Sequence, residues 1–240
     1  MLKRNLDMLH VFLDFEMNPT TNPIRRRQRS SKPATPPPAL RMEIIEIGAV
    51  KLDREYKQID SFSCYVRPEM NHITKKVTEI TGITDETVAD AVDFAQAMAA
   101  FVEWIGQEPV RIYAWSESDK KQLLAELRYK KLYDGQLPPN MRRWMDFQKV
   151  YTRIMGLSRS MSLSSAINII DNDFEGHQHS ALDDAANSAE LLRLVKNKEQ
   201  FAQKTAGIKK VFNKKDEPLT SSIGDLLAAE LARLQAEEDH

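Results

Sequence analysis

The order of the apolar segments is the strongest constraint on the fold. Three strand-like segments come first, at residues 9–16, 44–52 and 61–66, where apolar side chains alternate with polar ones or run together. Helical and strand-like spacing then alternate, with helices expected at 94–105, 119–132, 162–170 and 181–196, and strands at 109–115 and within 144–151. This order predicts an α/β fold in which helices cover the faces of a mixed sheet.

Composition limits the size and the environment of this fold. The 240 residues are 42% hydrophobic, which is enough for one sizeable α/β domain with appendages. The net charge of -1 gives no general attraction to nucleic acid or membranes, so any such preference is local. The single cysteine, Cys64, lies in an apolar alternation and is expected to be a core thiol in a reducing compartment. Because we find no signal-peptide core and no membrane-length apolar window, we expect a cytoplasmic protein without a membrane partner.

Two segments do not have the composition of a core. Residues 18–41 hold six prolines, six basic residues and no acidic residue, and are expected to be an insertion within a domain that covers residues 1–200. The arginines of this insertion either bind phosphates beside a site or have no role.

Residues 201–240 are expected to form a basic linker and then an amphipathic helix that begins at Ser222. This helix either packs on its own domain or mediates a homodimer.

Two carboxylates close the first strand. Asp14 and Glu16 lie in the sequence DFE, and a strand's period of two places both on one face while it turns Phe15 to the other. Adjacent carboxylates repel each other unless a proton or a cation joins them, and a site with oxygen ligands alone favours Mg²⁺ or Mn²⁺. By itself, the motif is also typical of an exposed strand end.

A histidine and a further carboxylate flank the start of the last domain helix, in the sequence HSALDDA. Ser180 as N-cap and Asp183 in the first turn are explained by helix capping alone. Capping does not explain His179 and Asp184. They reach a common site only if His179 precedes the helix and Asp184 points inward beneath it.

Asp119 is the fourth candidate carboxylate. It follows Ser116 by three residues, which also reads as a capping box at the start of a helix. The order of all five candidates along the chain favours the functional interpretation. An Asp-x-Glu motif closes the first strand, an aspartate opens a later helix, and His-x-x-x-x-Asp opens the last domain helix.

These segments resemble the DEDDh 3′→5′ exonucleases. The resemblance is carried by FLDFE, EIIEIGAVKLD, ITKKVTEITGIT, WSESDKKQL and HSALDDAANSAEL, which cover roughly residues 9–195, and it is strongest for the ERI-type and KapD-like branch. It implies an RNase H-like fold, a mixed five-stranded sheet flanked by helices, here with a C-terminal helical extension. The glycine usual in the WSESD segment of ERI-type proteins is replaced by Ser116 and Glu117.

The resemblance also implies roles for individual residues. The four carboxylates Asp14, Glu16, Asp119 and Asp184 would hold two divalent cations, Mg²⁺ or Mn²⁺, and His179 would be the general base. The residues implied in substrate binding are Phe15, Glu16, Met17, Gly82, Ile83 and His179. Ile83 is either a wedge against the terminal bases or a packing residue.

Two further histidines are expected to have no catalytic role. His177 competes with His179 for the role of base, but it has the wrong spacing to Asp184 and is expected to face solvent. His10 is expected to be a partly buried core histidine.

The expected function is that of a metal-dependent 3′→5′ exonuclease. Its substrates would be single-stranded RNA or DNA 3′ ends, with RNA favoured over DNA, and it would release nucleoside 5′-monophosphates by a two-metal mechanism. The alternative is a nucleic-acid-binding or adaptor protein on the same fold, with little catalysis.

Overall fold

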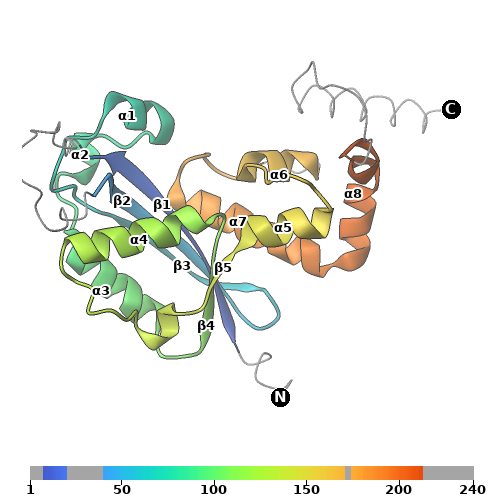
Figure 1. Cartoon of the computed structure of the whole chain (residues 1–240), viewed down its shortest axis with the longest axis horizontal. Coiled ribbons are helices and arrows are strands. Elements are labelled where there is room, and N and C mark those ends of the chain that lie inside the picture. Colours follow the sequence, from blue (N-terminus) through green and yellow to red (C-terminus); the bar gives the residue numbers. More distant parts are fainter. Residues whose placement is uncertain (1–7, 21–39, 171–173, 213–240) are drawn as a thin grey trace, which may run out of the picture. The chain divides into compact units, whose positions relative to one another are not determined.

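The computed structural model describes residues 8–20, 40–170 and 174–212, with the main chain only for 207–212 (Figure 1). Contacts divide the chain into two compact units. The first comprises Met1–Asp146 with Gly176–Ala186, and the second comprises Phe147–Glu175 with Asn187–His240. The expected extent of the exonuclease-like domain, residues 1–200, stays a prediction.

The first unit is built on a five-stranded mixed sheet with the order β3-β2-β1-β4-β5. Its strands are β1 Leu9–Pro19, β2 Met42–Leu52, β3 Gln58–Tyr65, β4 Val110–Ala114 and β5 Trp144–Asp146. The first three form an antiparallel meander, while β4 pairs with β1, and β5 with β4, in parallel. The prediction of a mixed five-stranded sheet flanked by helices is confirmed.

The odd-numbered side chains of β1 face the main hydrophobic core. Val11, Leu13 and Phe15 pack there with apolar residues of two helices, α3 (Phe94–Ile105) and α4 (Glu117–Tyr129). Figure 1 shows both helices beside the sheet. Cys64 packs against the same core but is only partly buried. Because strand side chains alternate, the even-numbered residues of β1 point to the opposite face.

Helix α7 (Ala181–Lys196) begins on that opposite face, against β2. A Cβ atom added at Gly48 would lie 2.0 Å from the main-chain nitrogen of Leu182. Such a separation is far inside van der Waals contact, so only glycine allows the first turn of α7 to approach β2 this closely.

Two short helices were not expected from the sequence. Helix α1 (Lys75–Thr81) begins at the N-cap Thr74 and ends at Gly82, whose φ is 76°. Helix α2 (Asp85–Val88) begins with a capping box of Thr84 and Thr87. Each has a buried residue in a small separate cluster that also contains Ile45 and Ile83. Helices this short depend on their caps and on this burial, because they have too few turns to show an apolar period.

The second unit is helical. It contains α5 (Phe147–Met155), α6 (Leu163–Ile169), α8 (Lys198–Phe212) and most of α7. The strand expected within 144–151 ends at Asp146, and α5 begins at the next residue. Helix α8 occupies residues that were assigned to a basic linker, so the linker prediction is wrong up to residue 212.

Two predicted features lie outside the described residues. They are the helix expected from Ser222 and nearly all of the Pro/Arg-rich insertion.

A 3₁₀ turn, Pro139–Met141, precedes β5. Among the described helices, none has the length and apolarity needed to cross a bilayer.

We predict that Gly48→Ala destabilises the protein by about 3 kcal/mol, the upper end of the usual effect of overpacking, because the new methyl group meets main-chain atoms that have no rotamer to change. Denaturant unfolding measures this loss. The matched control is Ser63→Ala at the paired position on β3, which is exposed and should stay within about 0.5 kcal/mol of the wild type. Equal stability of the two variants would contradict the close approach of α7 to β2.

Candidate active site

Asp14 and Glu16 lie on the even-numbered face of β1, as their spacing predicts. In the antiparallel pairing of β1 with β2, Asp14 is opposite Gly48 and Glu16 is opposite Glu46. The register shifts directly after Glu16, at Met17. The two carboxylates therefore share the face on which α7 begins, close to the end of the regular ladder.

Asp119 approaches the same strand from α4. The hydroxyl of the N-cap Ser116 accepts a hydrogen bond from the N–H of Ser118. The Asp119 carboxylate accepts hydrogen bonds from its own N–H, from the Ser118 hydroxyl and from the main-chain N–H of Phe15. The side chain is buried, with 5% of its surface exposed. Asp119 is thus turned toward β1 and does not complete the alternative capping box with Ser116.

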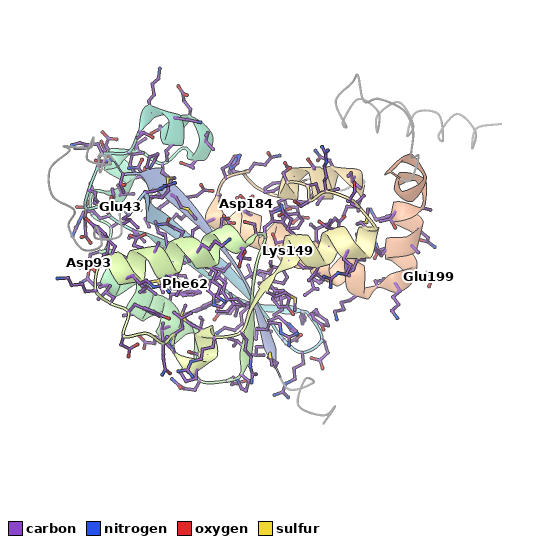
Figure 2. All side chains as sticks on the ribbon, in the orientation of Figure 1. Glu43, Phe62, Asp93, Lys149, Asp184 and Glu199 are labelled. Carbon is purple, nitrogen blue, oxygen red and sulfur yellow. The ribbon has the colours of Figure 1, made fainter. Side chains whose placement is uncertain are left out.

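His179 and Asp184 meet at the start of α7. His179 precedes the helix and has a φ of 65°, which is rare for a residue other than glycine. Its main-chain N–H donates to the Asp184 carboxylate. Ligand atoms of Glu16, His179 and Asp184 all lie within 4.8 Å of one another. Figure 2 labels Asp184 at this helix start. The structure therefore brings β1 and the first turn of α7 together at one site.

The loop before α7 is shaped by Asp183 and Gly176. The Asp183 carboxylate accepts a hydrogen bond of 2.9 Å from the N–H of His177. Gly176 has a φ of 84°, and a Cβ added there would lie 2.5 Å from the Asp183 carboxyl group. The loop therefore approaches the helix closely at a position where a side chain would not fit.

Burial raises the pKa of all four carboxyl groups, and the charges of nearby carboxylates raise them further. Burial is the largest cause in each case, and it raises the pKa of Glu16 to about 8, that of Asp184 to about 7 and that of Asp119 to about 6. The pKa of Asp14 rises well above its ordinary value because of burial and the charges of Asp119, Asp184, Glu16 and Glu46. Desolvation and like charges both favour the neutral acid.

The cluster fits a divalent cation. Among the described residues, the charges that act on these four pKa values are all carboxylates, including Glu46, Asp146 and Asp183. No lysine or arginine is among them, so the neutralising charge must come from protons or from a bound cation. Oxygen ligands with one histidine nearby suit a hard cation such as Mg²⁺ or Mn²⁺.

The residues expected to contact substrate differ in how far the structure exposes them. The side chain of Phe15 is 4% exposed and lies in the main core, and that of Ile83 is 3% exposed in the smaller cluster. Both side chains pack against other apolar residues, and their expected roles in substrate binding stay predictions. Met17 is partly buried against the main core, whereas Gly82 is exposed at the end of α1.

The remaining histidines behave as expected. His177 is exposed. His10 is buried, with its Nδ1 atom 2.9 Å from the Tyr113 hydroxyl oxygen. Neither is in the group that Glu16, His179 and Asp184 form.

Glu46 was missed by the sequence analysis. It is 4% exposed and lies on β2 directly opposite Glu16 of β1. Its charge raises the pKa of Asp14, Glu16 and Asp184. The available signal was a single acidic residue inside the apolar sequence IIEIGAV, because an acid in a buried strand needs a partner.

Comparison with known proteins identifies the family. A family model described as an exonuclease matches residues 11–192. The chain belongs to this exonuclease family.

Relatives of this exonuclease-family chain include nucleases of animals. The human 3'-5' exoribonuclease 1 is 27% identical over 175 residues, which are 65% of this chain and 46% of the relative. The mouse ERI1 exoribonuclease 2 is 30% identical over 198 residues, or 72% of this chain and 28% of the relative. The chain thus spans less than half the length of these two relatives.

Solved structures agree with the fold. The nuclease domain of 3'hExo, described as a DEDDh family member bound to rAMP, has a TM-score of 0.65 and 25% identity, covering 80% of this chain and 93% of that one. Exonuclease I has a TM-score of 0.60 and 17% identity, with 82% of this chain and 43% of that one covered. The second likeness shows the fold alone.

The raised pKa values predict that the metal-free protein loses stability as the pH rises. Unfolded carboxyl groups ionise near pH 4, whereas Asp119, Asp184 and Glu16 ionise in the folded protein at about 6, 7 and 8. The folded state therefore holds more protons between these limits, and its advantage is full below pH 4 and lost by pH 8. Thermal unfolding in EDTA should show a midpoint that falls from pH 5 to pH 8.

Two variants isolate the contribution of the cluster. Asp184→Asn removes one repelling charge and should reduce the fall, while Asp90→Asn, at an exposed carboxylate, should leave it unchanged. Added Mg²⁺ or Mn²⁺ should raise the midpoint at pH 8 more than at pH 5, because protons compete with the cation. A midpoint that rises with pH equally in all three proteins would contradict the electrostatic description of the site.

Proposed function

We propose that the chain is a metal-dependent 3′→5′ exonuclease that releases nucleoside 5′-monophosphates from single-stranded ends, with RNA as its preferred substrate. The observation that carries this proposal is the convergence of Glu16, His179 and Asp184. The charges of Glu16 and Asp184 raise the pKa of Asp14, and the charge of Asp119 raises those of Glu16 and Asp184. Membership of the exonuclease family supports it.

The carboxylates are proposed to hold the cations. Asp14 would hold the cations together with the other three carboxylates, whose charges raise its pKa. Glu16 and Asp184 would hold the cation on the side of His179, with which they share the group described above. Bound Mg²⁺ or Mn²⁺ would lower the pKa of water and stabilise negative charge on the phosphate and on the leaving oxygen.

His179 is proposed as the general base. Its side chain is exposed, so that water and substrate reach it, and the Asp184 carboxylate holds its main chain. A ring nitrogen of an imidazole can accept a proton from water, which is the role of a general base.

The proposed reaction is a simple displacement. The water oxygen forms a bond to the phosphorus of the terminal nucleotide as its proton passes to His179. The bond from phosphorus to the 3′ oxygen of the preceding nucleotide breaks, and that oxygen takes a proton from solvent. The products are a nucleoside 5′-monophosphate and a strand shortened by one nucleotide.

RNA is proposed as the preferred substrate on the strength of the relatives. Several relatives carry the name exoribonuclease, and one solved structure of a relative is described as recognising the 3' end of histone mRNA. The cytoplasmic location and the homodimer through the C-terminal helix stay predictions.

We predict that the protein shortens 5′-labelled single-stranded RNA from its 3′ end with Mg²⁺ or Mn²⁺ and not in EDTA. Resolving the products as a ladder over time measures the rate, and a matched DNA measures the preference. His179→Ala should lower the rate by about 10²–10⁴-fold, the usual contribution of a general base. His177→Ala is the control, because this exposed histidine is two residues away and should retain the wild-type rate.

Two results would contradict the proposal. Equal losses in the two histidine variants would show that His179 is not the base. Intact strands that the protein still retards on a gel would favour the alternative, a nucleic-acid-binding or adaptor protein with little catalysis.

A further inference from the structure

The side chain of Glu46 connects the middle of the sheet to the start of α7. Its Oε2 atom accepts a hydrogen bond of 3.1 Å from the main-chain N–H of Ala181, the first residue of α7. The first N–H groups of a helix have no partner within the helix. A carboxylate at this position satisfies one of them and lies at the positive end of the helix dipole.

Gly48 complements this contact. It is two residues beyond Glu46 on β2 and therefore on the same face of the sheet. The absence of a side chain at Gly48 lets the main chain of Ala181 and Leu182 lie directly against β2. Glu46 and Gly48 together form the part of β2 on which α7 rests, which we call the seat of α7. Glu46 contributes a hydrogen bond, and Gly48 allows the close approach.

The turn that rests on this seat carries two of the proposed active-site groups. Asp184 lies in the first turn of α7, and its N–H donates to the carbonyl oxygen of Ser180 at 2.9 Å. The N–H of His179 in turn donates to the Asp184 carboxylate. A shift of Ala181 would therefore move both His179 and Asp184 relative to Glu16.

Stability alone does not account for a carboxylate at position 46. The side chain is buried, and it faces Glu16, another acid, across the strands. Burying a further negative charge in such a cluster is unfavourable, and an apolar side chain of similar volume would avoid that penalty. What an apolar side chain lacks is an acceptor for the Ala181 N–H.

We propose that Glu46 is a positioning residue, which holds the first turn of α7 on β2 and thereby sets the places of His179 and Asp184 beside Glu16. Glu46 does not touch substrate in this role, and it acts through the main chain of Ala181. The proposal rests on the proposed function for its kinetic consequences, but not for its structural ones.

The test compares two substitutions at Glu46 that differ in one property. Glu46→Leu has similar volume and no hydrogen-bond acceptor. Glu46→Gln lacks the charge but keeps an oxygen that accepts the Ala181 N–H. Glu43→Leu is the matched control, because Glu43 is also a fully buried glutamate of β2 and accepts main-chain N–H groups, those of Glu69 and Met70. Figure 2 shows Glu43 away from Asp184.

Three readouts are taken on the full chain. They are Mn²⁺ affinity by calorimetry, kcat and KM on a single-stranded oligoribonucleotide, and amide hydrogen exchange of the peptide that covers 177–186. We expect Glu46→Leu to lower kcat and Mn²⁺ affinity by about 10–100-fold, as the loss of a partner behind metal ligands does. KM should stay unchanged, and exchange at Ala181 should become faster. Glu46→Gln should recover most of kcat and of the protection at Ala181.

The control variant, a failure of this proposal and a failure of the proposed function each give a different result. Glu43→Leu should lower the unfolding midpoint while Mn²⁺ affinity and exchange at Ala181 stay as in the wild type. The proposal is overturned if Glu46→Leu keeps the wild-type Mn²⁺ affinity and the wild-type protection of the Ala181 amide from exchange. It is also overturned if Glu46→Gln is as impaired as Glu46→Leu, because the charge of Glu46 would then matter rather than its hydrogen bond. If the wild type cleaves no strand, the proposed function fails, while calorimetry and exchange still test the role of Glu46.

Discussion

Mutual repulsion of carboxylates is the constraint on which the site depends. Asp14, Glu16, Asp119 and Asp184 are brought together by one strand and two helices, and burial and the charges of nearby carboxylates raise every one of their pKa values. In free solution such groups would separate. The fold must therefore hold them in place, and a compensating positive charge must come from outside the cluster.

Main-chain hydrogen bonds hold the carboxylates of the site in place. Asp119 accepts from the N–H of Phe15, and Asp184 accepts from the N–H of His179. Glu46 accepts from the first N–H of α7. Each of these donors is a main-chain group, so the placement of each carboxylate depends on the backbone of a neighbouring segment.

The sequence predicts most of this site because its residues follow local rules. Asp14 and Glu16 share a face by strand alternation, and the spacing of His179 before α7 and Asp184 inside it allows them to meet. Asp119 required the order of motifs along the whole chain, since its spacing from Ser116 fits a helix cap equally well. The resemblance to DEDDh exonucleases resolved that choice, and the hydrogen bond from Phe15 agrees with it.

Other features depend on contacts that no local pattern contains. Glu46 and Ala181 are 135 positions apart in sequence, so their hydrogen bond exists only in the folded chain. The packing of Ile83 in one cluster with Ile45 and Val88 likewise exists only in the folded chain. No local pattern shows that β5 ends at Asp146 or that the helix α8 extends to Phe212.

The most direct test of the central claim is the number of protons released when Mn²⁺ binds. Calorimetric titrations at pH 7 in two buffers with different ionisation enthalpies measure it. Since the pKa of Glu16 is raised to about 8 and that of Asp184 to about 7, both groups hold protons at this pH that a cation must displace. The account predicts proton release on binding, reduced in Asp14→Asn and Asp184→Asn. Binding without proton release, or no binding of Mn²⁺, would contradict the assignment of these carboxylates to one cation site.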